Sequence, residues 1–146
     1  MDRWKFYDIT HRDHVVCNPT SVGKLDKLIG LLDLGPEARV LDIASGKGEF
    51  IVRVAERHGG PGGVGFHGVA VDISPFCVAD LRAKVGSRVP EADFEILEMD
   101  GAEYRAESAR VRPGVVHGRK LGVWRTPRHV AGTRRCDPAG RRRSRR

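Results

Sequence analysis

Three acidic residues each lie at or near the end of a short apolar run in the first two-thirds of the chain. Asp42 follows Val40 and Leu41, Asp72 follows a run of valine and alanine, and Asp100 follows a third run that ends at Met99. A carboxylate accepts hydrogen bonds from hydroxyl and amine groups. If the three runs are parallel strands, their carboxyl ends meet at one crevice, where open α/β sheets bind ligands. The spacing therefore predicts one polar binding site.

Small residues follow Asp42 at alternate positions: Ala44, Gly46 and Gly48. Without side chains at the two glycines, the backbone turns sharply and a ligand approaches it closely. Asp72 comes 24 residues after Gly48. An acidic residue at the end of the second strand is typical of a site that holds both ribose hydroxyls of an adenosine. Together these residues indicate a nucleoside-containing ligand.

The stretch from Val40 to Phe50 resembles the first motif of class I S-adenosylmethionine-dependent methyltransferases. In that family an acidic residue precedes small residues at alternate positions, and Ala44 here replaces the commoner glycine. The resemblance implies that S-adenosylmethionine is the cofactor and that an acidic residue after the third strand accepts from the adenine amine. The binding residues that we expect are Asp42, Ala44, Gly46, Gly48, Asp72, Ile73, Asp100 and Gly101.

A nicotinamide-binding turn is the alternative interpretation of the same glycines. Gly46-Lys47-Gly48-Glu49-Phe50-Ile51 lacks the third glycine of the G-x-G-x-x-G pattern. Asp42 would also stand near a pyrophosphate, and like charges repel, whereas the amino-acid end of the methyl donor presents an ammonium group. Asp72 suits either cofactor. The first motif therefore favours the methyl donor over NAD(P).

The elements that must position these residues alternate between helix and strand. Apolar residues recur at helical spacing between Val22 and Leu32, after Thr20 or Ser21 as the first cap, and again after Gly48 and after Pro75. The strands that we expect are 38–44, 68–73 and 93–99. Short connections of this kind imply a parallel sheet covered by helices on both sides. The predicted fold class is α/β, a Rossmann-like parallel sheet with flanking helices that forms an incomplete methyltransferase fold.

Three segments follow from this pattern: an amino-terminal helical or lid segment (1–36), a cofactor-binding core (37–104) and a basic tail (105–146). In the first segment, Tyr7 and His11 are candidates for a place beside methyl transfer, by analogy with lids in related enzymes. A polar helix with surface histidines explains them equally well, so no catalytic base is assigned. The three cysteines, Cys17, Cys77 and Cys136, form no C-x-x-C pair. We therefore expect reduced structural thiols and no zinc or other metal site.

Charge divides the chain unevenly. Residues 1–104 carry 12 basic and 17 acidic residues, whereas residues 105–146 carry 14 basic and 2 acidic ones. A basic arm that binds nucleic acid is one interpretation of the tail. We favour a frameshifted reading of the missing half of the gene, because arginine codons arise readily when a GC-rich gene is read out of phase. Shifted by one base, residues 107–146 are able to encode a segment that resembles the next strand, helix and Pro-Gly-Gly turn of the same family.

The sequence therefore predicts methyl transfer to a small-molecule acceptor, with the chain itself an inactive fragment. Nucleic-acid binding and membrane association are not expected, and a cytoplasmic location is. Three parallel strands would leave one central strand edge unpaired. We therefore expect poor solubility, a disordered tail from about Arg110, and proteolysis that leaves a fragment ending near Arg105.

Overall fold

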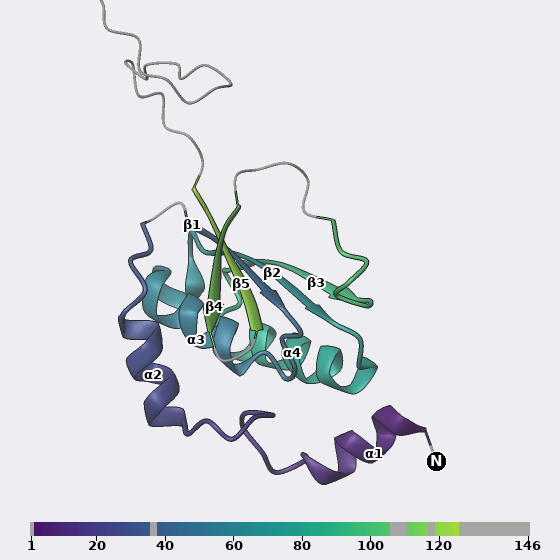
Figure 1. Ribbon diagram of the computed structural model, residues 1–146. Coiled ribbons are helices and arrows are strands. Elements are labelled where there is room, and N and C mark those ends of the chain that lie inside the picture. The colour runs from purple at the N-terminus through teal and green to yellow at the C-terminus, as the bar shows by residue number, and fades with distance from the viewer. Residues whose placement is uncertain (1, 36–37, 106–110, 117–118, 126–146) are drawn as a thin grey trace, which may run out of the picture.

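The computed structural model describes residues 2–35, 38–105, 111–116 and 119–125 (Figure 1). Its elements are α1 (Arg3–Thr10), α2 (Val22–Gly30), β1 (Ala38–Ile43), α3 (Glu49–His58), the 3₁₀ turn η1 (Pro61–Gly63), β2 (His67–Asp72), α4 (Pro75–Arg88), β3 (Asp93–Glu98), β4 (Val111–Val116) and β5 (Arg119–Arg125). The sheet has the strand order β3-β2-β1-β5-β4.

The first three strands form the predicted parallel sheet. Val40 pairs with Gly68 across β1 and β2, and Ala70 pairs with Ile96 across β2 and β3. Helix α3 connects β1 to β2, and α4 connects β2 to β3. The predicted Rossmann-like α/β fold class is therefore confirmed, and its parallel part is limited to three strands.

Serine residues begin two of the helices. The Ser21 hydroxyl accepts from the Lys24 N–H at the start of α2, and the Ser74 hydroxyl accepts from the Cys77 N–H at the start of α4. Such caps satisfy backbone donors that have no partner within the first helical turn. Pro75 occupies the first turn of α4, where a missing N–H costs nothing. The sequence prediction placed the cap of α2 at Thr20 or Ser21, and Ser21 is the one used.

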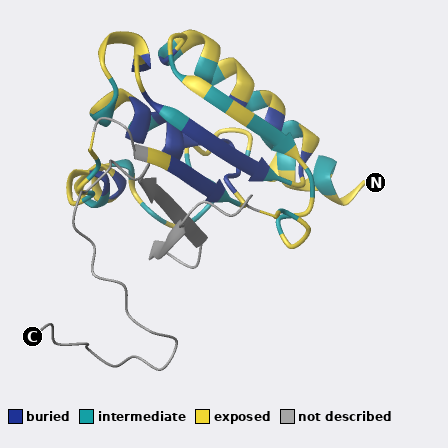
Figure 2. Cartoon of the chain, turned by 90° about the horizontal axis from the view of Figure 1, so that it is seen from above, coloured by how far each residue is buried: buried dark blue, intermediate teal, exposed yellow. Residues whose placement is uncertain are grey.

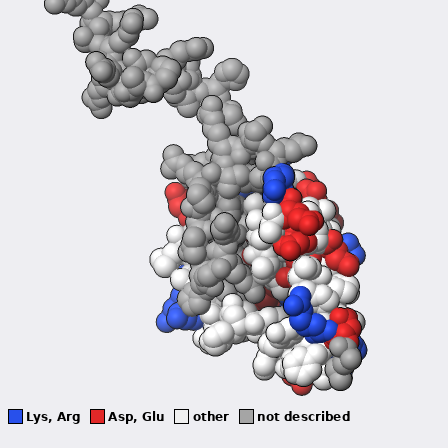
Figure 3. Space-filling model, turned by 45° about the vertical axis from the view of Figure 1, so that its right-hand side comes forward, with Lys and Arg blue, Asp and Glu red and all other residues white. Residues whose placement is uncertain are grey.

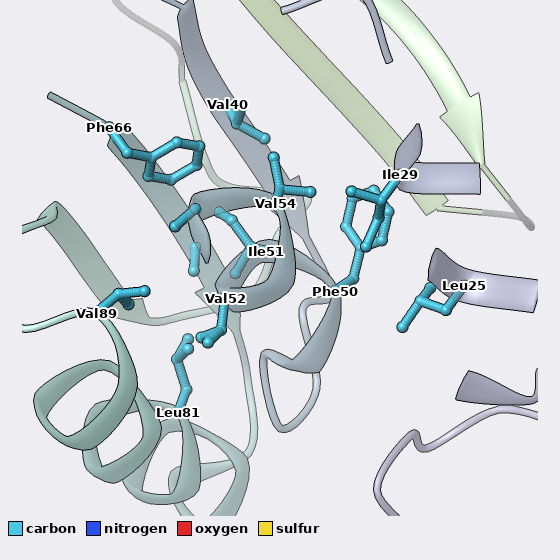
Figure 4. Packing of buried hydrophobic residues seen from close by; sticks show 12 residues of the cluster. Leu25, Ile29, Val40, Phe50, Ile51, Val52, Val54, Phe66, Leu81 and Val89 are labelled. Atoms are coloured by element: carbon cyan, nitrogen blue, oxygen red, sulfur yellow. The ribbon is translucent and has the colours of Figure 1, made fainter. Parts of the chain in front are cut away.

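One face of the sheet carries the main core. Residues from α2, α3 and α4 pack there against β1 and β2, and Figure 4 shows Leu25 and Ile29 approaching Phe50 while Val52 faces Leu81. Ile51, Val52, Val54 and Ala55 of α3 are fully buried. The buried members of this cluster are Leu25, Ile29, Val40, Phe50, Ile51, Val52, Val54, Ala55, Phe66, Ala70, Leu81 and Val89.

The opposite face differs from the prediction. Leu41, Val69 and Val71 alternate with the residues of the main core and form a smaller cluster with Leu97, Met99 and Tyr104. Among the described residues, helices α2 to α4 all belong to the first cluster, so the expectation of helices on both faces is wrong for this part of the chain. Figure 2 shows the central strands as the most buried part of the sheet, with β3 more exposed.

Strands β4 and β5 also differ from the sequence prediction, which placed no regular structure beyond residue 105. The two strands pair with each other, and β5 lies antiparallel to β1, with Val40 opposite Val123. Valines and Trp124 favour extended backbone in this segment. A further parallel strand would need a crossover of a dozen residues or more, whereas an antiparallel hairpin needs only a short turn.

The hairpin pairs the edge of β1, so the unpaired central edge that we expected is not present, while poor solubility itself stays a prediction. Residues 106–110, 117–118 and 126–146 lie outside the described residues. The predictions of disorder from Arg110 and of cleavage in the Arg-rich end therefore stay predictions for those residues.

Candidate functional site

The turn between β1 and α3 explains why small residues alternate there. Ala44, Gly46 and Gly48 have φ angles of 61°, 57° and 71°. All three lie in the left-handed region, which L-residues with a Cβ enter at a cost and glycine enters freely. The small residues of the motif are therefore required by the backbone conformation of the turn. Of the three, Ala44 is the one whose Cβ makes this conformation strained.

Gly48 has a second requirement, which comes from packing. A Cβ at this position would lie 2.1 Å from Leu81 Cδ1. Gly48 also begins α3 and provides no side-chain cap. Its small size therefore brings α3 and α4 together, and it serves the fold whether or not a ligand approaches it.

Asp72 joins the end of β2 to the glycine turn. One carboxylate oxygen accepts from the Gly46 N–H at 2.7 Å, and the other accepts from the Ser74 N–H at 2.9 Å. The Ser45 N–H donates to the Val71 carbonyl, so two consecutive residues of the turn are bound to the end of β2. The sequence predicted that the first two strand ends converge, and this contact is how they do so.

The end of β3 reaches the same place. The Met99 N–H donates to the Asp72 carbonyl, and a Cβ on Gly101 would lie 2.4 Å from Ile43 Cγ2. Asp100 is exposed, and its carboxylate accepts from the Ala102 N–H at 2.8 Å. Gly101 therefore has to be small because its backbone crosses the end of β1.

The expected site residues differ in their depth. Asp42 is 1% exposed and shares the helix-covered face with Val40, Asp72 is half-buried, and Ala44, Ile73 and Asp100 are exposed. The structure brings the three strand ends together at one edge of the sheet. The contact of each with a ligand stays a prediction.

Lys47 was not predicted to matter, yet it anchors the amino-terminal segment. Its side chain is 9% exposed, and Nζ donates to the carbonyl oxygens of His11 at 2.8 Å and Arg12 at 2.9 Å. Nζ also lies 3.4 Å from a carboxylate oxygen of Asp80 on α4. The segment after α1 is therefore fastened to the glycine turn.

This contact bears on the two candidate catalytic residues. The ring of His11 lies 6.0 Å from that of Tyr7, and its Nδ1 is 3.1 Å from the Tyr7 carbonyl oxygen. Tyr7 is 49% exposed. The backbone of His11 thus lies against the glycine turn through Lys47, whereas a role for either ring in catalysis stays a prediction.

Glu49, the first residue of α3, is a buried carboxylate with three cationic partners. Its side chain is 4% exposed, and its oxygens lie 2.6 Å from Arg53, 3.0 Å from Lys84 and 2.9 Å from Arg88. Burial raises the pKa of Glu49, but the hydrogen bonds from these partners outweigh it and lower the pKa to about 2. The group is charged at neutral pH and connects α3 to α4 beneath the turn.

Part of this cluster is visible in the sequence. Glu49 and Arg53 are four residues apart, as are Lys84 and Arg88, and residues at that spacing share one helix face. Nothing in the sequence shows that the two faces meet. The burial of Lys47 leaves no such signal, because a lysine in a glycine-rich turn is expected to point into solvent.

Comparisons with known proteins agree with this geometry. No family model matches the chain. A solved S-adenosylmethionine-dependent methyltransferase from Thiobacillus denitrificans, in complex with S-adenosyl-L-homocysteine, aligns with a TM-score of 0.63 and 28% identity over 75% of this chain and 42% of its own. A second, from Geobacter sulfurreducens with the same ligand, aligns with a TM-score of 0.63 and 27% identity over 75% and 41%.

An uncharacterized protein of Escherichia coli, YjhP, is 26% identical over 106 residues, which are 73% of this chain and 40% of that protein. The chain therefore spans about two-fifths of the length of the relatives that it matches.

Proposed function

We propose that this chain, whose fold is that of part of the class I S-adenosylmethionine-dependent methyltransferases, binds S-adenosylmethionine beyond the carboxyl ends of β1, β2 and β3. Its activity would be methyl transfer to a small-molecule acceptor. The active site would be completed by the part of the similar proteins that lies outside the region aligned with this chain. Two similar solved proteins hold S-adenosyl-L-homocysteine, the demethylated form of that cofactor. The cytoplasmic location expected from the sequence remains part of the proposal.

The observation that carries the proposal is the position of the Asp72 carboxylate. Each of its oxygens accepts one backbone N–H. A carboxylate has about four acceptor sites, so two remain for hydroxyl groups. Because Gly46 and Ser74 fix the carboxylate on both sides, it is oriented before a ligand arrives, and that lowers the entropic cost of binding.

The other strand ends supply complementary contacts. The Asp100 carboxylate is exposed and suits an amine donor such as the edge of adenine. Asp42 supplies a buried carboxylate near the end of β1, a group that, when ionised, favours an ammonium group. The left-handed turn at Gly46 leaves no side chain between the backbone and a ligand. When bound, the cofactor would supply an electrophilic methyl group, and these residues would bind and orient it.

The alternatives receive less support. The Asp42 carboxylate is poorly suited to a pyrophosphate, and the third glycine of the nicotinamide-binding pattern is absent, so a nicotinamide-dependent oxidoreductase is disfavoured. For nucleic acid, residues 1–104 carry 12 basic against 17 acidic residues, and Figure 3 shows Asp and Glu side chains gathered on one face with fewer Lys and Arg beside them. No described helix is long and apolar enough to cross a membrane.

Calorimetry with S-adenosylmethionine, S-adenosyl-L-homocysteine and NADH tests the proposal on the full chain. We expect binding of the first two and none of NADH. Asp72→Ala should weaken binding by about 1.5–3 kcal/mol, the range for hydrogen bonds to a charged group. Asp93→Asn, a change at the opposite end of β3, is the matched control and should leave affinity unchanged. Tight NADH binding without binding of the methyl donor would overturn the proposal in favour of the oxidoreductase.

We also propose that the basic tail is a frameshifted reading of the family's next strand and helix. Sequencing of the gene across codons 101–110 tests this directly. A single-base insertion or deletion there, with restored homology downstream, is the expected result. An intact frame would instead favour a genuine basic segment, which salt-dependent binding to oligonucleotides would then reveal.

A further inference from the structure

Helix α4 contacts the glycine turn from one of its faces. Lys47 Nζ lies 3.4 Å from a carboxylate oxygen of Asp80, and a Cβ on Gly48 would meet the side chain of Leu81. One helical turn further along, Lys84 binds the residues on both sides of Gly48. Positions 80, 81 and 84 are three or four residues apart, so they share one face of the helix. This face of α4 therefore supports the turn.

The ammonium group of Lys84 bridges the two residues that flank Gly48. Its Nζ donates to the Lys47 carbonyl oxygen at 3.0 Å and lies 3.0 Å from a carboxylate oxygen of Glu49. The side chain of Lys84 is 23% exposed and that of Glu49 is 4% exposed. Hydrogen bonds that involve a charged group are strong, and more so where water is largely excluded. Lys84 is thus bound to the backbone of the turn as well as to the buried acid.

The bond to the Lys47 carbonyl fixes one peptide plane of the turn. The C=O of Lys47 and the N–H of Gly48 belong to the same planar unit and point in opposite directions. The N–H donates to the Ser45 carbonyl at 3.0 Å, and the C=O accepts from Lys84 at 3.0 Å. A glycine by itself adopts many backbone conformations. The bonds on both sides of this plane therefore help to select the φ of 71° at Gly48.

The neighbouring residue of the turn is held by a group of the opposite charge. The Asp72 carboxylate accepts from the Gly46 N–H at 2.7 Å, whereas the Lys84 ammonium donates to the Lys47 carbonyl. An anion at the end of β2 thus binds a donor of the turn, and a cation on α4 binds an acceptor of the next residue. Two consecutive residues of the turn are therefore clamped between β2 and α4.

We propose that Lys84 is a positioning residue of the cofactor site, whose ammonium group holds the glycine turn in the conformation that receives the methyl donor. This inference rests on the proposed function, because it concerns the same site. A turn that is ordered before the ligand arrives loses less entropy on binding. Without Lys84, the Lys47 carbonyl loses its charged donor, and the cost of ordering the turn is added to binding. A lysine that only joined α3 to α4 through Glu49 would affect stability and not affinity.

A pair of variants of the full chain, Lys84→Met and Arg53→Met, separates positioning from stability. Each removes one cationic partner of Glu49, and Arg53 otherwise pairs with Asp26 on α2. Both variants should therefore lower stability in urea denaturation. Only Lys84→Met should weaken the binding of S-adenosyl-L-homocysteine in calorimetry, by about tenfold, which is the size of effect expected for one lost hydrogen bond to a charged group. If methionine at position 84 prevents folding, Lys84→Gln provides the same comparison.

An NMR measurement on the ligand-free chain tests the turn without the cofactor. Lys84→Met should shift the amide resonances of Gly46 and Gly48. It should also raise the rate of hydrogen exchange at the Gly48 N–H by about tenfold, because local opening of the turn becomes easier. Arg53→Met should leave both quantities as they are in the wild type.

The two measurements distinguish failure of this inference from failure of the proposed function. Equal effects of Lys84→Met and Arg53→Met on the turn, or an unchanged turn in Lys84→Met, would overturn the positioning role. A wild-type chain that binds no S-adenosyl-L-homocysteine, but whose turn is disturbed only by Lys84→Met, would contradict the proposed function and still support Lys84 as the residue that holds the turn.

Discussion

The glycine turn and the amino-terminal segment that lies against it are held in different ways. The turn is fixed by its own left-handed backbone, by the Asp72 carboxylate and by the packing of Gly48 on Leu81. The segment around His11 is held by the amino group of Lys47. The first region depends on steric and backbone constraints, and the second depends on a few polar groups that respond to solution conditions. The turn should therefore tolerate little change, while the segment should detach by itself.

The largest effect should come from Gly48→Ala. Alanine would have to adopt the left-handed backbone of Gly48, and its Cβ would clash with Leu81 Cδ1. Left-handed backbone and overpacking together predict a loss of about 2–5 kcal/mol in the free energy of unfolding, measured by urea denaturation.

Gly86→Ala is the matched control for that change. Gly86 lies in α4 with open space around it, so alanine there should stabilise the chain by about 0.5–1 kcal/mol. If the two variants change stability equally, the turn is not sterically constrained as described.

The second effect concerns the pH dependence of stability that comes from the buried carboxylate of Glu49. Because the pKa of Glu49 is about 2 in the folded chain and near 4.5 otherwise, its ion pairs stabilise the fold fully above about pH 4.5. That contribution, roughly 2–3 kcal/mol, should be lost as the pH falls from about 4.5 to 2. Denaturant titrations at several pH values measure it.

Glu49→Gln should remove most of this pH dependence and lower stability at pH 7. Glu95→Gln, at an exposed position on β3, should preserve the wild-type profile. Identical profiles for wild type and Glu49→Gln would contradict the assigned pKa.

The third effect separates the segment from the turn. Lys47→Met removes the donor to His11 and Arg12, and hydrogen bonds to a charged group contribute about 1.5–3 kcal/mol. We expect faster tryptic cleavage after Arg12 and faster amide exchange over residues 11–17, while protection of α3 is retained. Lys24→Met, at an exposed position on α2, is the control. Loss of protection throughout the core would show that the segment is not a separate unit.

The sequence allowed the local part of this molecule to be predicted. The three parallel strands, the helices between them and the turn follow from apolar periodicity and from glycines whose backbone role is local. Contacts between distant segments were not predictable in the same way. That Lys47 reaches the Arg12 carbonyl depends on how the amino-terminal segment lies against the glycine turn, which no periodicity encodes.

The hairpin of β4 and β5 was missed for a different reason. Its segment is rich in arginine, and that composition suggested a solvated tail. Pairing to β1 uses backbone groups, which every residue except proline offers in full. An unpaired edge on a buried strand is thus able to pair with a segment even where its arginine content suggests a solvated tail.

The smallest effect tests the one strained position of the turn. Ala44 has a φ of 61° and is exposed, so its methyl group contributes little packing while the left-handed backbone costs about 1 kcal/mol. Ala44→Gly should relieve that cost, offset in part by the greater freedom of glycine in the unfolded chain, for a net gain of about 0.5 kcal/mol. Ala79→Gly makes the same chemical change at an exposed position in α4 and should destabilise by about 1 kcal/mol. Opposite signs for the two variants in thermal or urea unfolding would show that the backbone angle, and not the loss of a methyl group, determines the response. A loss of stability in both would mean that Ala44 is not strained, and that the turn accepts alanine without cost.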